Sequence, residues 1–112
     1  MRDYKLYLED IRDAIKKIEK YTRGVSMRKF IKNNLIIDAV IRNLQIIGEA
    51  ARKIPDSEKG RIPEIEWRRL AGLRNILVHE YFGVDNDILW DVVAHKIPEL
   101  KRQVGTVLRK KK

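Results

Sequence analysis

Cysteine is absent from the sequence, and only two histidines and three prolines occur among its 112 residues. The absence of cysteine excludes disulfides and thiolate metal sites, and two histidines offer little to a zinc site, so we expect neither a metal nor a cofactor. No segment approaches the roughly 20 consecutive apolar residues that cross a bilayer. The N-terminus also lacks the apolar core of a signal peptide, and together these absences predict a cytoplasmic protein.

Charged residues are abundant instead, at 37% of the chain, with 25 Lys and Arg against 16 Asp and Glu and a net charge of +9. The length fits one domain, which we place at residues 1–108, followed by a basic tail at residues 109–112. The positive charge favours nucleic acid or an anionic membrane as a partner. The tail itself is either a solubilising terminus or an arm that binds nucleic acid.

Apolar residues recur at helical spacing along most of the chain and predict helices rather than strands. The predicted helices cover about residues 3–21, 26–54, 63–82 and 87–108. The residues expected to face the core are Tyr4, Leu8, Ile11, Ile15, Ile18, Phe30, Ile37, Val40, Ile41, Leu44, Ile47, Ala51, Ile54, Ile65, Trp67, Leu70, Leu73, Ile76, Leu77, Ile88, Leu89, Val92, Val93, Ile97, Leu100, Val104 and Leu108.

These segments predict an all-α fold, a four- or five-helix up-down bundle. The first two helices are expected to pair as an antiparallel hairpin, since a short connection around Gly24 joins them. Pro98 lacks a backbone donor and is expected to kink or split the last helix near Lys96. Trp67 and Trp90 are expected to anchor the core or an interface rather than stack on bases, and His95 to have a surface or capping role.

One face of the second helix is polar although the rest of that helix is apolar. Asp38, Arg42, Gln45 and Glu49 follow one another at spacings of four, three and four residues and share this face. The face is either a solvated edge held by an ion pair between Asp38 and Arg42, or the polar lining of a site.

The segment Arg74–Tyr81 concentrates a guanidinium, an amide, an imidazole and a phenol within about two helical turns. Asn75 and His79 are four residues apart and share a helix face, as do Arg74 and Tyr81, seven residues apart. Arg74 and His79 differ by roughly 140° around an ideal helix. The length of the arginine side chain or a loosened helix end would close this gap.

These groups suit the cleavage of RNA by its own 2′-hydroxyl, which needs two proton transfers and positive charge beside the phosphate. Histidine has an unperturbed pKa of about 6.5 and gives and takes protons near neutrality. Arginine matches phosphate oxygens with a planar fork, and asparagine orients either partner. The purely structural alternative makes His79 a helix-end residue that satisfies carbonyls, Arg74 a surface charge and Tyr81 the edge of the core.

The run of Arg74 and Asn75, then His79, then Tyr81 resembles the Arg-x4-His-x-Tyr signature of the HEPN superfamily, specifically its HepT-like toxin branch. The resemblance covers about Leu8 to Leu100. Further residues match at similar spacing: Asp38-Ala39, Arg42-Asn43-Leu44, Ile47-Gly48-Glu49-Ala50, Trp67, Gly72, Tyr81-Phe82, Trp90 and Ile97-Pro98.

This resemblance implies a helical domain that dimerises, cleaves RNA without metal and acts as the toxin of a toxin–antitoxin pair. It implies that Arg74, Asn75 and His79 are the catalytic set. It also implies a nucleotidyltransferase antitoxin that silences the enzyme by transferring AMP to Tyr81. Such a group would place negative charge within one turn of His79, where it would compete with the substrate phosphate.

The residues themselves add an argument for a homodimer. The reaction needs one general acid and one general base, but His95 is the sole histidine besides His79. A two-fold dimer would supply two copies of His79 and two of Arg74. We therefore expect the active site to straddle the dimer axis, with Arg42 and Glu49 near its rim. The alternative function is not enzymatic: the chain would be a non-catalytic module that binds RNA or docks the nucleotidyltransferase.

Overall fold

The computed structural model describes residues 3–79 and 86–110, and their side chains except those of 74–79 and 110. Helix α1 spans Tyr4–Thr22, within one residue of the predicted 3–21. Asp3 caps it, because its side chain accepts a hydrogen bond of 2.9 Å from the backbone N–H of Lys5. Gly24, with φ at 71°, turns the chain after the helix.

The predicted continuous helix over 26–54 is wrong at one point, because two helices occupy this segment. Helix α2 spans Met27–Ile31 and helix α3 spans Asn34–Lys53. Between them, Asn33 lies outside the helical region at φ −113° and ψ 93°, and its side chain caps α3 by accepting a hydrogen bond of 3.1 Å from the N–H of Ile36. Ser26 caps α2, as expected for the start of this segment.

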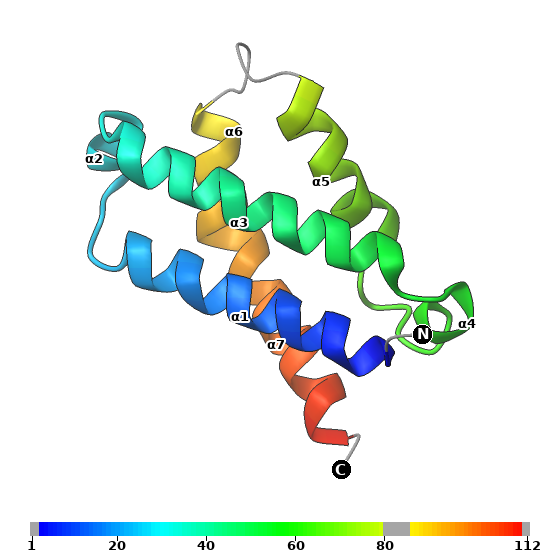
Figure 1. Cartoon of the computed structure of the whole chain (residues 1–112). Helices are drawn as coiled ribbons and strands as arrows, with labels where there is room; N and C mark the ends of the chain where they lie inside the picture. Colours follow the sequence, from blue (N-terminus) through cyan, green and yellow to red (C-terminus); the bar gives the residue numbers. More distant parts are fainter. Residues whose placement is uncertain (1–2, 80–85, 111–112) are drawn as a thin grey trace.

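Helices α1 and α3 lie side by side and antiparallel, as predicted (Figure 1). After α3, Pro55 precedes a single-turn helix, α4, at Asp56–Lys59. Helix α5 spans Trp67–His79 and packs against α3 (Figure 1).

Helix α5 begins at Trp67 rather than near Pro63 or Glu64. The preceding residues form turns instead, with hydrogen bonds from Ile65 N–H to the Ile62 carbonyl at 3.3 Å and from Trp67 N–H to the Ile65 carbonyl at 2.9 Å. These turns place Ile62 and Ile65 in the core, where they are 5% and 3% exposed. The burial of two isoleucines therefore outweighs the helix-starting preference of a proline.

The last part of the chain is one helical path with a changed pitch. Helix α6 spans Asn86–Asp91, close to the predicted start, and the π-helical turn η1 spans Val92–Lys96 before helix α7 at Ile97–Lys110. The N–H of Ile97 donates to the carbonyl of Val92, five residues earlier, and the next residue, Pro98, has no N–H to donate. The predicted kink or split near Lys96 is replaced by a π-helical turn in a path that stays helical.

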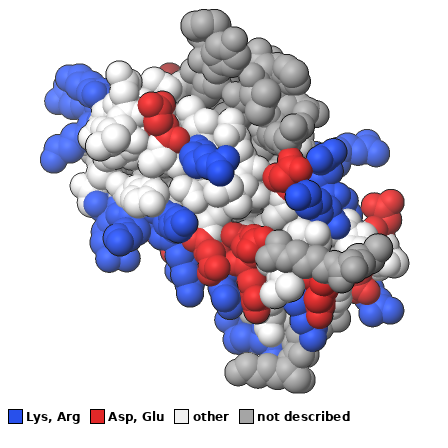
Figure 2. Space-filling model, in the orientation of Figure 1, with Lys and Arg blue, Asp and Glu red and all other residues white. Residues whose placement is uncertain are grey.

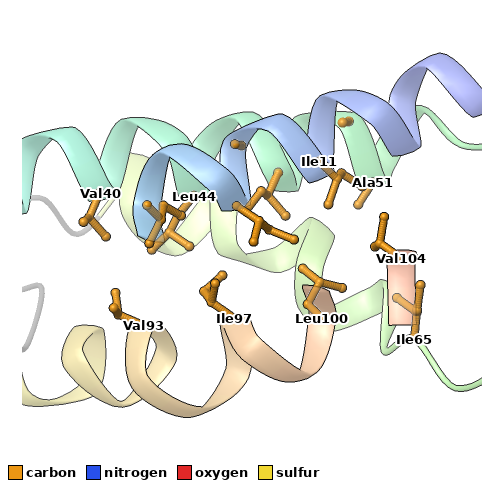
Figure 3. Close-up of a cluster of buried hydrophobic side chains, with 14 of the residues drawn as sticks. Ile11, Val40, Leu44, Ala51, Ile65, Val93, Ile97, Leu100 and Val104 are labelled. Carbon is orange, nitrogen blue, oxygen red and sulfur yellow. The ribbon is translucent and has the colours of Figure 1, made fainter. Parts of the chain in front are cut away.

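The core lies between α1 and α3 on one side and α6, η1 and α7 on the other. In Figure 3, Val40 and Leu44 of α3 point toward the interior that Val93 and Ile97 also enter. The buried apolar residues are Leu8, Ile11, Ala14, Ile15, Ile18, Phe30, Ile37, Val40, Leu44, Ile47, Ala50, Ala51, Ile54, Ile62, Ile65, Leu89, Val93, Ile97, Leu100, Val104 and Val107.

One residue predicted for the core lies at the surface. Ile88 is 64% exposed, because its neighbour Leu89, about 100° further around the helix, takes the inward position at 3% exposed. Trp67, Leu70 and Leu73 pack against the core at partial burial, as predicted.

The described residues contain no strand, so the all-α prediction is confirmed. Four principal helical segments, α1, α3, α5 and the α6–η1–α7 path, build the bundle, and α2 and α4 are short additions (Figure 1). Arg109 and Lys110 of the predicted tail continue α7. Within residues 3–79 and 86–110, none of the helices combines the length and the apolar character that a membrane span requires.

Candidate active site

The candidate catalytic segment begins in a helix whose first half is firmly held. Trp67 starts α5, and its indole N–H donates a hydrogen bond of 3.0 Å to the carbonyl of Ile62. Leu70 and Leu73, one and two turns later, pack against the core. Because an α-helix is stiff over this length, the contacts of the first half fix the direction in which the second half of α5 projects.

Arg74, Asn75 and His79 all lie on the backbone of α5, which continues through His79. Asn75 and His79 are therefore on one helix face, one turn apart, and Arg74 is displaced from His79 by roughly 140° around the axis. Helix α5 thus does not loosen before His79. The reach of the arginine side chain remains as the way to bring the guanidinium of Arg74 and the imidazole of His79 together. The side chains of these three residues, and the whole of Tyr81, lie outside the described residues.

The polar face of α3 is present, but the ion pair expected on it is not. Asp38 and Arg42 are both exposed, and no ion pair joins these two described residues. Glu49 is half-buried and pairs instead with Arg52, at 2.9 Å, and with Lys53, at 3.9 Å. The expected ion pair between Asp38 and Arg42 is therefore wrong. The other interpretation, in which this face is the rim of a site, stays a prediction.

Asn43 is a buried polar residue that the helical pattern did not single out. It is 4% exposed, and its side-chain amide donates a hydrogen bond of 2.9 Å to the carbonyl of Ala39. Its Oδ1 atom is buried and has no hydrogen-bond partner among the described residues. An asparagine between the core positions Val40 and Leu44 is the sequence signal that would have identified it.

The other polar and aromatic candidates have structural surroundings. His95 is largely exposed and lies 3.1 Å from a carboxylate oxygen of Asp91, which confirms the predicted surface position. Trp90 packs on the buried ring of Phe30, with a centroid distance of 5.1 Å, and Trp67 is held through its indole N–H. Both tryptophans are half-buried against the core, as predicted, rather than free for base stacking.

Acidic residues and histidines do not gather into a metal-binding group in the part of the chain that the structure describes. No three of them lie close enough together to hold an ion there.

Comparison with known proteins gives a consistent result. The family model described as "Ribonuclease HepT-like" matches residues 11–107, a range that includes α3, α5 and the segment Arg74–Tyr81. A protein of Thermococcus cleftensis named "Probable ribonuclease HepT" is 48% identical over 89% of this chain and 91% of its own length. No solved structure matches the chain.

Two further relatives cover almost the full length of both chains. A protein of Methanocaldococcus jannaschii that is named as an RNase is 41% identical over 95% of this chain and 97% of its own. A protein of Caldanaerobacter subterraneus subsp. tengcongensis, also named as an RNase, is 36% identical over 100% of both. With the helical fold and the family match over residues 11–107, these relatives show that the chain belongs to the family of HepT-like ribonucleases.

Proposed function

We propose that the chain is a metal-independent RNA endoribonuclease, that it acts as a homodimer, and that it is the toxin of a toxin–antitoxin pair. The observation that carries the proposal is the position of Arg74, Asn75 and His79 on α5 in a chain that belongs to the HepT-like ribonucleases. These three residue types supply a general base, a permanent positive charge and an orienting amide.

In the proposed reaction, the imidazole of His79 accepts the proton of a ribose 2′-hydroxyl as that oxygen attacks the adjacent phosphorus. The bond from phosphorus to the 5′-oxygen of the next nucleotide breaks, and a second imidazole, protonated, gives its proton to that oxygen. The guanidinium of Arg74 stabilises the charge on the crowded phosphate. The products are a 2′,3′-cyclic phosphate and a 5′-hydroxyl.

The second imidazole is His79 of the partner subunit in this proposal, because His95 is exposed and lies beside Asp91. The site would then contain two copies each of His79 and Arg74. Asn75 would orient either the imidazole or the guanidinium, and Arg42 and Glu49 would lie at the rim. Arg42 is exposed and free to approach a substrate, which supports a place at the rim.

Cleavage of a defined single-stranded RNA in the presence of a chelator tests the enzymatic part. We expect His79→Ala to lower the cleavage rate by about 10²–10⁴-fold, the usual contribution of a general acid or base, while RNA binding persists. His95→Ala is the matched control and should cleave like the wild type, because His95 is a surface residue.

A wild-type protein that binds RNA but never cleaves it would contradict the enzyme and favour a non-catalytic RNA-binding or nucleotidyltransferase-docking module. Growth arrest on expression, relieved by His79→Ala, would support the toxin role.

The regulatory part of the proposal is AMP transfer to Tyr81 by a nucleotidyltransferase antitoxin. The phenol oxygen would attack the α-phosphorus of a nucleoside triphosphate, and pyrophosphate would leave. The added phosphate would lie two residues from His79 and repel the substrate phosphate.

Intact-mass measurement after co-expression with the nucleotidyltransferase should show added AMP on Tyr81 and a loss of cleavage. Tyr81→Phe, which keeps the ring and removes the attacking oxygen, should show neither change. AMP mapped to another residue would contradict this part alone.

A further inference from the structure

The end of the bundle around α2 carries a group of basic side chains with no acidic residue among them in the sequence. No acidic residue occurs between Glu19 and Asp38. All the basic residues in this interval are exposed. We call this group the α2 basic surface, and its members are Lys20, Arg23, Arg28, Lys29 and Lys32.

None of these five side chains forms an ion pair with any residue that the structure describes. Elsewhere the cations are often paired, for example Arg52 with Glu49 at 2.9 Å and Lys101 with Glu19 at 3.1 Å. Unpaired cations keep their full attraction for an external anion. Figure 2 shows Lys and Arg gathered over the end of the molecule where α2 lies.

Acidic residues on the neighbouring elements do not neutralise this group. Helix α6 packs against α2 and carries Asp87 and Asp91, and Asp91 is already engaged with His95 at 3.1 Å. Asp38 lies one turn into α3. These three carboxylates are fewer than the five cations, so the group keeps a positive excess of two.

The fold holds these cations in place. Ser26 caps α2 through a hydrogen bond of 3.2 Å to the N–H of Lys29. Phe30 is fully buried, and its ring packs on that of Trp90 of α6. The basic side chains of α2 therefore extend from a helix that is anchored to the rest of the bundle, and less ordering entropy is lost when they bind a ligand.

The α2 basic surface also lies within reach of the candidate catalytic segment. Helix α5 ends at His79 and α6 begins at Asn86, so at most seven residue steps, or about 25 Å, separate them. Since α2 touches α6, an RNA strand of a few nucleotides would extend from the segment around His79 to α2.

We propose that the α2 basic surface binds the phosphates of an RNA strand beyond the cleaved bond. This inference rests on the proposed ribonuclease function. A polyanion fits the observations better than a membrane does, because α2 spans only five residues and is too short to lie in a bilayer interface as an amphipathic helix. The surface would increase the affinity for long RNA without taking part in the chemistry.

The test is binding of a fluorescent single-stranded RNA of roughly 20 nucleotides, longer than the footprint of about 4–16 nucleotides of small single-strand-binding domains. All proteins carry His79→Ala, so that cleavage does not interfere. The test variant carries four further substitutions to Gln, at Arg23, Arg28, Lys29 and Lys32. The control variant removes the same charge from two exposed lysines and two exposed arginines elsewhere, with Gln at Lys16, Lys17, Arg68 and Arg102.

We expect the test variant to bind at least about tenfold more weakly than the control variant at moderate salt. The slope of log affinity against log salt should fall by about 0.7 for each phosphate that the protein no longer neutralises, or about 3 for four phosphates. Equal affinities and equal slopes in the two variants would overturn the proposal. Unchanged RNA binding with a selective loss of binding to anionic vesicles, or to an acidic protein partner, would overturn it as well.

Two further measurements keep the result interpretable. Thermal unfolding checks that both variants fold, and if the fourfold test variant does not, the pair Arg28→Gln and Lys32→Gln replaces it, with a slope reduction of about 1.4 expected. With His79 restored, the test variant should cleave a dinucleotide at the wild-type rate but a long RNA more slowly. A wild-type protein that cleaves no RNA refutes the proposed function, whereas the binding comparison still decides about the surface.

Discussion

Asn43 is a buried polar residue on the helix that packs against the candidate catalytic helix, and it affects the stability of the fold. It is 4% exposed within an otherwise apolar stretch of α3, and α3 packs against α5, the helix that carries Arg74 and His79. Its Oδ1 is buried without a hydrogen-bond partner among the described residues. Leaving a buried acceptor unsatisfied destabilises the folded state by about 1–3 kcal/mol. An apolar side chain at this position would not have that cost.

We therefore expect Asn43→Leu to raise the free energy of unfolding by about 1 kcal/mol. Leucine has the same branched heavy-atom skeleton as asparagine and removes the unsatisfied oxygen, while the carbonyl of Ala39 keeps its helical hydrogen bond from the backbone N–H of residue 43. Chemical denaturation, read as a change in midpoint at constant slope, provides the measurement.

Asn34→Leu on the exposed start of the same helix is the control for this prediction and should change stability by less than about 0.5 kcal/mol. A loss of stability in Asn43→Leu would show that Oδ1 is satisfied after all. The same variant can be assayed for RNA cleavage, because a more stable but slower enzyme would indicate that the amide serves the site.

At the scale of elements, apolar spacing predicted which helices exist but not where they break. Phe30 and Ile37 are seven residues apart and face the core whether or not the helix is continuous, so the pattern gave no sign of the interruption at Asn33. The local signal was the pair Asn33-Asn34, in which a side chain caps the next helix. Pro98, by contrast, predicted the disturbance at η1, because proline lacks a backbone N–H whatever its surroundings are.

The candidate site was predictable from the sequence as far as chemistry and position along the chain are concerned. Residue types and spacing place Arg74, Asn75 and His79 on one helix, and α5 contains all three. Spacing does not determine which side chains of α3 face that helix, because this depends on how two helices cross. The expected pair of Asp38 and Arg42 failed for another reason, because both side chains are exposed and an exposed pair four residues apart gains only a few tenths of a kcal/mol.

At the scale of the whole molecule, two large aliphatic side chains of the described residues are mostly exposed to solvent. Leu35 is 81% and Ile88 64% exposed. Exposed aliphatic side chains of this size are the kind that a subunit interface covers, so both are candidates for the contact surface of the homodimer that we propose.

If the active site is built across a two-fold axis, specific activity must depend on protein concentration. We expect the cleavage rate per chain to fall on dilution in parallel with the dimer fraction measured by sedimentation, because a monomer holds one His79 where two proton-transfer groups are needed. Mixing wild-type chains with an excess of His79→Ala chains tests the same point, since a mixed dimer holds a single His79 and should cleave as slowly as a site that lacks one proton-transfer group. A protein that sediments as a monomer at the assay concentration and still cleaves at its full rate would show that one chain holds a complete site, and the second proton-transfer group would then have to come from within that chain.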